Sequence, residues 1–287
     1  MWVILVCAAL VLAGLAAVIR WGGLPVEPPP APARPEGDPT EPPPVSLVVR
    51  RYLWYLVVTM ASGAVAGILA AGAGGRLVMR LLAVTAGAGA QGRITEAEEI
   101  VGRITIGGTI AFVVFTGLFL GLPSAAGYLL LRRWLPAGRA AGLAYGALLL
   151  VVAGTRLEPL RRGNPDFDLV GPGWLAVAAF TALVVFHGML VAALAGRLSR
   201  AVPLLAARPG PIAIHLPLLL LVLPGPALAS VLVLIGVAVV LLSRIPSMLA
   251  AWRSRPVLPA GRVVLAAAAL VAFPGFASSV VDIVSRP

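Results

Sequence analysis

The segment Gly92–Arg103 is the most informative polar stretch of the chain, because its acids could do acid–base chemistry. Thr95 is followed three residues later by Glu98, which is the spacing of a capping box, where a hydroxyl and a carboxylate bind the unpaired amides of a helix start. Glu99 and Arg103 are four residues apart, in the order that stabilises a helix surface. We therefore expect a helix to begin at Thr95, with Glu99 and Arg103 paired on its surface.

Residues 98–103 also resemble the EExxxR motif of the CAAX-type membrane endopeptidases. In that family the paired Glu residues, with His residues from later helices, activate a water for peptide hydrolysis. The resemblance implies Glu98 and Glu99 as catalytic carboxylates and His187 as the nearest later His. The sequence departs from the family where its FxxxH motif needs Phe, since Leu183 stands there. We expect no enzymatic activity and keep the peptidase as the second alternative.

His187 lies in the middle of the apolar run 169–196. Ionisable groups at membrane depth often line a polar path, so one interpretation makes His187 a proton or substrate site of a small-solute transporter. Its candidate polar neighbours are Thr181 and Thr116. The alternative interpretation is a neutral His that is hydrogen-bonded to one of these hydroxyls or to a backbone carbonyl and serves packing alone.

Residues 164–168 and 171–173, with the sequences NPDFD and GPG, have the composition of a surface turn. Asn and Asp bond their own backbone in turns, and Pro and Gly fix the dihedrals. The acids of this region, with Glu158, could gather around a hard cation, but they lack calcium-loop spacing. We expect neither a metal nor a cofactor. The candidate outer-loop interaction residues are Glu96, Glu99, Arg103, Asn164, Asp166 and Asp168.

The elements that position these residues belong to a membrane protein, because the composition excludes a water-soluble globule. Of the 287 residues, 60% are apolar and 11% are charged, and the mean hydropathy is +1.01, whereas soluble domains carry about a quarter charged residues. All 22 basic residues are Arg, at the ends of apolar runs rather than on one face, so the net charge of +11 does not predict nucleic-acid binding. The single Cys excludes an internal disulfide.

Seven charge-free runs approach or exceed the roughly 20 residues that a helix needs to cross a bilayer. The run 209–243 is ambiguous because Pro224, Gly225 and Pro226 interrupt it. As a hairpin it gives eight spans and places 14 of the 22 Arg residues on one side; as a single kinked crossing it gives seven spans and divides the Arg residues evenly. The positive-inside rule favours eight spans. The seven runs are 1–19, 52–75, 104–131, 140–155, 169–196, 209–243 and 263–281.

The Arg residues of the short loops predict the orientation of the bundle. Residues 20–51, 132–139 and 197–208 contain ten of them, which marks these segments as cytoplasmic. The opposite segments, 76–103 and 156–168, contain six of the eleven acids. The N-terminus is therefore expected outside.

Four regions are expected along the chain. Residues 1–21 form a retained anchor helix, with a cleaved signal peptide as the alternative. Residues 22–49 form a Pro-rich linker that holds this helix at a distance from the bundle. Residues 50–200 form a core four-span bundle with two outer polar loops, and residues 201–287 form a C-terminal membrane segment.

Small residues at four-residue spacing recur in the helices expected for the core bundle. In a bilayer, helix association depends on close backbone approach, which such small-xxx-small pairs permit. We expect them to mark the packing faces of one tight unit. The expected packing residues are Gly63 with Gly67, Gly117 with Gly121, Gly142 with Gly146, and Gly188 with the small residues that follow it.

Residues 75–86, 95–108 and 164–173 resemble an uncharacterised family of multi-pass membrane proteins from high-GC bacteria. The resemblance implies the bacterial plasma (inner) membrane and no known reaction. We therefore expect an all-α, polytopic transmembrane helix bundle that is a structural or interaction component. Its partners are the lipid bilayer and a membrane or extracytoplasmic protein, and the transporter that uses His187 is the first alternative.

Overall fold

The computed structural model describes residues 2–30, 43–96, 98–156, 159–204, 225–245 and 256–286, and of residues 225–229 it describes the backbone alone. All regular secondary structure in these ranges is helical. An isolated antiparallel bridge between Ile94 and Ile100 is the one extended pairing within them. The all-α class predicted from the sequence is therefore confirmed.

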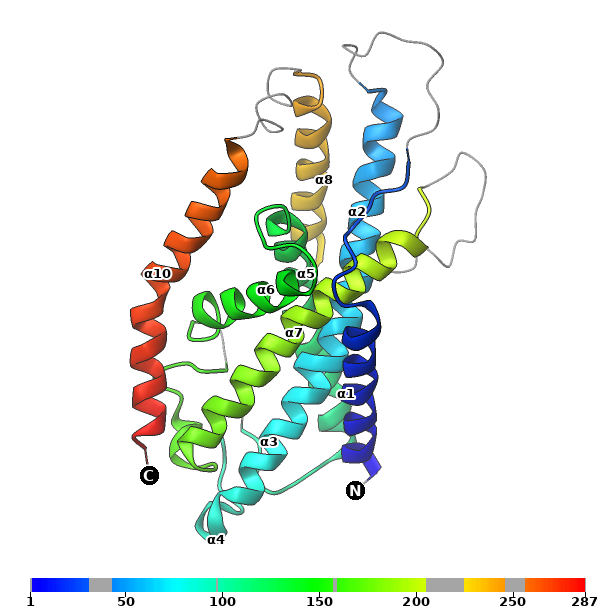
Figure 1. The fold of residues 1–287 in the computed structure, drawn as a ribbon. Helices are drawn as coiled ribbons and strands as arrows, with labels where there is room; N and C mark the ends of the chain where they lie inside the picture. The colour runs from blue at the N-terminus through cyan, green and yellow to red at the C-terminus, as the bar shows by residue number, and fades with distance from the viewer. Residues whose placement is uncertain are drawn as a thin grey trace.

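The described helices follow one another along the chain (Figure 1). They are α1 (Trp2–Trp21), α2 (Val45–Ala66), the π-helical turn η1 (Gly67–Gly72), α3 (Ala73–Thr85), α4 (Gly87–Ala90), α5 (Ile106–Leu131), α6 (Arg139–Val152), the 3-10 turn η2 (Pro165–Asp168), α7 (Gly173–Ala201), α8 (Gly225–Leu242) and α10 (Val257–Val284).

Five of the described helices are long and apolar enough to cross a membrane. They are α1, α5, α7, α10 and the continuous helix Val45–Thr85, which joins α2, η1 and α3. The bilayer interior offers backbone groups no water, so these runs satisfy their hydrogen bonds internally and are helical despite their Gly and Val content. At 14 residues α6 is shorter than the roughly 20 that a crossing needs.

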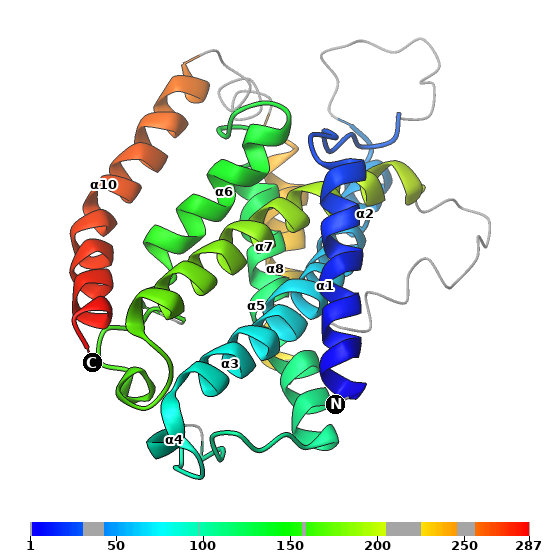
Figure 2. The same cartoon turned by 60° about the horizontal axis from the view of Figure 1, so that its bottom comes forward.

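The long helix Val45–Thr85 is the central element, and its direction changes at η1 (Figure 1). A π-helical turn inserts an extra residue into the helix and commonly bends it. On one side it packs against α5 and on the other against α7 and α1, while α6 runs alongside α7 (Figure 2). α8 lies beside α2, and α10 forms the edge of the bundle next to α6 and α7 (Figure 2).

One end of the bundle contains residues 132–138, and we call it the arginine end. The Trp134 indole Nε1 donates to the Val257 carbonyl at 3.2 Å, so α10 begins here. The Arg139 guanidinium donates to the Ile19 carbonyl at 2.9 Å, so α1 ends here. The last residues of α7 and the first turns of α2 also lie at this end (Figure 1).

The opposite end contains residues 86–96, 98–105, 153–156 and 159–172, and we call it the loop end. Both chain termini lie there (Figure 1). The Arg286 guanidinium donates to the Asn164 carbonyl at 2.9 Å, which fixes the end of α10 against the second loop. The Glu96 amide donates to the Asp166 carboxylate at 2.7 Å, which joins the two loops.

Four of the glycines expected at packing faces bring α5 against the long helix. A Cβ at Gly63 would lie 2.8 Å from the Gly121 carbonyl oxygen, which is closer than side chains come. A Cβ at Gly67 would overlap the Gly117 carbonyl. The two backbones approach this closely because neither helix carries a side chain at the crossing.

The remaining expected glycines join α6 to α7. A Cβ at Gly146 would lie 2.7 Å from the Val185 Cα, and one at Gly142 would lie 2.9 Å from the Met189 Cα. Gly188 of α7 faces Gly146 of α6, and a Cβ at Gly188 would lie only 2.5 Å from the Gly146 amide nitrogen.

The first helix is part of the bundle, whereas the sequence suggested an anchor held at a distance. Cys7, Ala17 and Val18 of α1 are buried, and the latter two join the core cluster that contains Leu190 of α7. The described part of the linker also packs on the bundle, because the Glu27 amide donates to the Ser199 hydroxyl at 3.2 Å. Residues 31–42 of the linker lie outside the described residues.

The helix expected to begin at Thr95 is absent from the described residues around it, so that prediction is wrong. Residues 92–101 fold back on themselves: the Thr95 amide donates to the Glu99 carbonyl at 2.9 Å. Glu98 has a positive φ of 58°, which a continuing helix excludes. The helix starts at Ile106, and Thr105 is its N-cap, accepting from the Gly108 amide at 3.2 Å.

Candidate functional site

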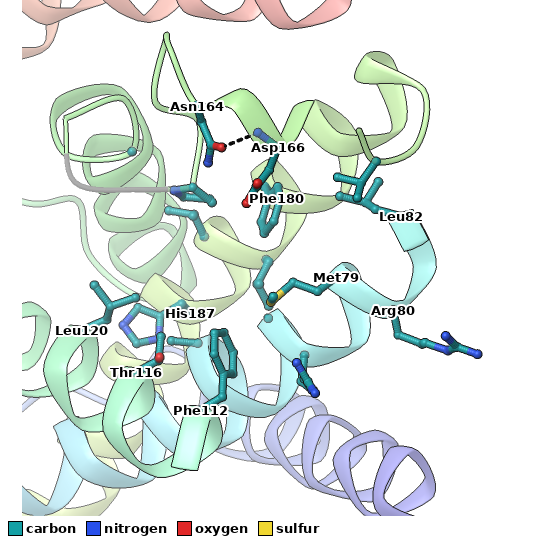
Figure 3. Close-up of a pocket in the computed structure, with 18 of the residues that line it drawn as sticks. Met79, Arg80, Leu82, Phe112, Thr116, Leu120, Asn164, Asp166, Phe180 and His187 are labelled. Carbon is teal, nitrogen blue, oxygen red and sulfur yellow. Dashed lines mark hydrogen bonds between the residues drawn. The ribbon is translucent and has the colours of Figure 1, made fainter. Parts of the chain in front are cut away.

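A cavity of about 790 Å³ lies between α3, α5, α6 and α7, and its walls are mainly apolar. It extends from the two loops at the loop end to His187 on α7 (Figure 3). Met79, Phe112 and Phe180 project into it from three of the helices (Figure 3). An apolar cavity of this size with a few polar groups is typical of a small-molecule site.

His187 belongs to a buried polar network at the deep end of the cavity. Its Nε2 atom lies 2.7 Å from the Ser124 hydroxyl oxygen of α5. The Tyr145 hydroxyl of α6 donates to the Ser124 carbonyl, and the Tyr145 ring packs edge-on against Tyr128 at 5.3 Å between centroids. The network therefore joins α5, α6 and α7.

The other ring nitrogen of His187, Nδ1, makes no hydrogen bond within the described part of the chain, although the Ala66 carbonyl is close enough to interact with the ring. Of the two expected neighbours, Thr116 lines the same cavity and lies beside His187 in Figure 3. Thr181 is six residues earlier on α7 and is not among the residues that line the cavity. The hydrogen-bond partner of His187 is thus Ser124.

Near the loop end, the cavity is lined by Arg76 of α3. Arg76 is buried inside the bundle, with 8% of its surface exposed. Its Nε donates to the Thr109 hydroxyl at 3.2 Å. One turn later on α3, Arg80 also lines the cavity, and its Nη1 donates to the Gly102 carbonyl at 3.3 Å.

The candidate interaction residues of the two loops are brought together at the loop end. Asp166 accepts the Glu96 amide, and the Glu96 carboxylate pairs with Arg161. Asn164 caps η2 by accepting the Asp166 amide at 2.8 Å. Asp168 pairs with Arg286 at 3.3 Å. The remaining two candidates, Glu99 and Arg103, line the cavity at this end.

The residues that the peptidase resemblance implies do not form one site. Glu98 and Glu99 lie in the folded-back loop at the loop end, whereas His187 lies deep between the helices. Within the described residues no three His, Cys, Asp or Glu side chains lie close enough to hold a metal ion. Glu158, the further acid considered for a cation, lies outside the described residues.

Comparison with family models, curated proteins and solved structures found no match to this chain. Its chemistry must therefore be argued from the cavity itself. That cavity combines an apolar body, a buried Ser–His–Tyr network at its deep end and charged groups at the loop end.

Sequence reasoning missed three residues of this site. Ser124 and Tyr145 lie in apolar helices, and nothing in their spacing indicates that they join the network of His187. Arg76 directly follows the charge-free run 52–75, and the sequence does not show that the helix continues past it to Thr85. Ionisable residues inside spanning segments mark functional sites more often than packing sites.

Proposed function

We propose that this chain is a multi-pass protein of the bacterial plasma membrane that binds a small solute with an apolar body in the cavity. This is the transporter interpretation of His187, and one observation carries it. The cavity extends from the loop end to the Ser124–His187 pair. An apolar hollow with a few convergent polar groups is what a small-molecule site needs, and a bundle with only a structural role does not need one.

The proposed orientation has the loop end outside and the arginine end in the cytoplasm. The support is the positive-inside rule, since Arg132, Arg133 and Arg139 lie at the arginine end. We also propose the hairpin interpretation of residues 209–243. It is supported by the end of α7 and the start of α10, which lie at the same end of the bundle (Figure 1). The first arm of this hairpin lies outside the described residues.

The test of binding is saturable uptake of radiolabelled 1-octanol by the full chain in zwitterionic nanodiscs, with empty nanodiscs to subtract partitioning into lipid. The variant is Leu120→Trp, whose larger side chain fills the cavity from α5. Its matched control is Phe119→Trp on the neighbouring position, which is 74% exposed and does not line the cavity. We expect saturable binding that Leu120→Trp removes and Phe119→Trp retains. Equal binding by both variants would refute the proposal.

Transport is tested by counterflow of the same solute across proteoliposomes. His187→Ala is expected to abolish any pH dependence of the flux while the variant still purifies as a folded protein. A flux that keeps its pH dependence in His187→Ala would remove His187 from the transport step.

A second candidate function, an interaction component, is favoured by the joined loops. The Glu96–Asp166 and Glu96–Arg161 contacts make one polar surface from two loops. A partner protein is expected to co-purify in mild detergent and to be lost when residues 164–168 are scrambled. Retention of the same partner by the scrambled chain would place the contact elsewhere.

A further inference from the structure

We propose that Arg76 makes the cavity a site for an amphipathic anion, with a carboxylate or phosphate head at the loop end and an apolar part reaching toward His187. This rests on the proposed function, because it names the class of ligand that the same cavity binds.

The guanidinium of Arg76 is buried and held in place. Its Nε donates to the Thr109 hydroxyl at 3.2 Å, and Thr109 in turn donates to the Thr105 carbonyl at 2.9 Å. Thr109 is only 1% exposed, so this anchor cannot rotate into water. The two Nη groups make no hydrogen bond within the described residues, which leaves four N–H donors of a residue that lines the cavity.

No carboxylate in the described part of the chain forms an ion pair with Arg76. Of the acids that line the cavity, Glu96 pairs with Arg161 and Asp166 accepts the Glu96 amide. The third, Glu99, accepts no bond from Arg76, and its amide donates to the Thr95 hydroxyl at 3.2 Å.

A buried cation without an anion is costly, and a paired one is not. The planar fork of Arg matches the two oxygens of a carboxylate or phosphate. Arg76 would repel a cationic solute. An anion without an apolar part would leave the walls formed by Phe112, Leu120 and Phe180 in contact with water. An anion with an apolar chain satisfies both parts of the cavity.

The experiment compares octanoate with 1-octanol, which has the same chain length and no charge, on the full-length protein in zwitterionic nanodiscs. We expect octanoate to bind at least about tenfold more tightly than octanol, which is the effect of a charge-assisted hydrogen bond. Arg76→Gln is expected to remove this preference while octanol still binds. Arg76→Lys keeps the charge and is expected to retain most of it, and the exposed Arg20→Gln at the arginine end is the control.

The outcomes separate this inference from the proposed function. If octanol and octanoate bind equally well to the wild type, Arg76 selects no anion, but the cavity still binds apolar solutes. If neither binds saturably, the proposed function itself fails. If Arg76→Gln does not fold, the wild-type comparison and the variant Thr109→Val still test the proposal. Thr109→Val removes the hydrogen bond that holds the guanidinium. An unchanged octanoate preference in Thr109→Val would contradict the anchored geometry.

Two further arms identify the source of the anion. Inorganic phosphate that displaces octanoate at equal concentration would show that the apolar chain contributes nothing, which overturns the amphipathic part of the proposal. Nanodiscs that contain phosphatidylglycerol test a lipid headgroup: weaker octanoate binding by the wild type, but not by Arg76→Gln, would support a membrane lipid as the ligand. Unchanged octanoate binding would support a free amphipath.

Discussion

At the scale of single residues, the Ser124 hydroxyl determines how His187 is held between the helices. The hydroxyl has one proton, and two acceptors lie within reach: the His187 Nε2 at 2.7 Å and the Gly121 carbonyl at 2.9 Å. Ser124 therefore either donates to the His187 Nε2 atom, or donates to the Gly121 carbonyl and accepts from a protonated His187 Nε2 atom. In either arrangement, His187 depends on Ser124 for its hydrogen bond at Nε2.

Ser124→Ala is expected to lower the free energy of unfolding by about 1–3 kcal/mol, because it leaves a buried ring nitrogen without a partner. The measurement is unfolding by SDS titration in mixed micelles, followed by circular dichroism. Thr85→Ala is the control, since that hydroxyl is exposed and bonds only to carbonyls of its own helix. Equal stability of Ser124→Ala and the wild type would mean that the pair contributes nothing.

The sequence indicated His187 as a buried polar residue but not its partner. Thr116 and Thr181 were the expected neighbours because they are polar residues in apolar runs. Which residue meets His187 depends on the rotation of α5 about its own axis, and that rotation is fixed by the glycine contacts with the long helix. A nearly uniform apolar helix shows no such rotation in its periodicity.

At the scale of elements, close backbone contacts hold α5 against η1. Gly67→Ala would place a methyl group against the Gly117 carbonyl, and neither backbone can move without opening the interface. We expect a loss of about 1–3 kcal/mol, the usual cost of overpacking. The control is Gly275→Ala in α10, where a Cβ would meet nothing within 4 Å. It is expected to stabilise by up to about 1 kcal/mol through helix propensity. If both variants change stability by the same amount in SDS titration, the contact is not tight.

A further element-scale prediction concerns α10, which is held chiefly by contacts near its two ends. Arg286 donates to the Asn164 carbonyl, and it pairs with Asp168 at 3.3 Å and with Asp282 at 3.0 Å. Arg286→Gln should leave global stability within about 1 kcal/mol, because ion pairs near the surface contribute little. It should instead speed amide exchange in residues 159–172, measured by hydrogen–deuterium exchange. Unchanged exchange there would show that Arg286 does not hold the loop.

Helix ends were harder to predict than helices. Thr95 and Thr105 are both of a residue type that caps helices, and only Thr105 caps one. Gly92 and Gly102 both have positive φ, at 82° and 88°, and these two reversals let the segment between them pair with itself. The capping-box spacing at Thr95 is local, whereas the competing pairing depends on both glycines.

At the scale of the whole molecule, hydropathy and length predicted a membrane bundle, because in the apolar bilayer interior a helix satisfies the backbone hydrogen bonds of such runs internally. They could not predict that α1 packs against the bundle or that a cavity remains between α3, α5, α6 and α7. Both depend on which side chains fill the space between helices, and apolar residues are nearly interchangeable by hydropathy alone. Whether the two chain termini lie on the same side of the membrane depends on whether the number of crossings is even or odd. That number depends on the ambiguous run 209–243.

The proposed topology is tested by cysteine labelling in a Cys7→Ser background. Four exposed positions serve as probes: Gly89 and Gly163 at the loop end, and Ala137 and Ala260 at the arginine end. With an impermeant maleimide on intact cells, the first two should react and the last two should react only after lysis. Ala260 carries the decision, because a single crossing by residues 209–243 would expose it outside, while a hairpin keeps it with Ala137. Labelling of Ala260 alongside Gly163 in intact cells would therefore exclude the hairpin. Reaction of both Ala137 and Ala260 before lysis, without reaction of Gly89 and Gly163, would invert the orientation.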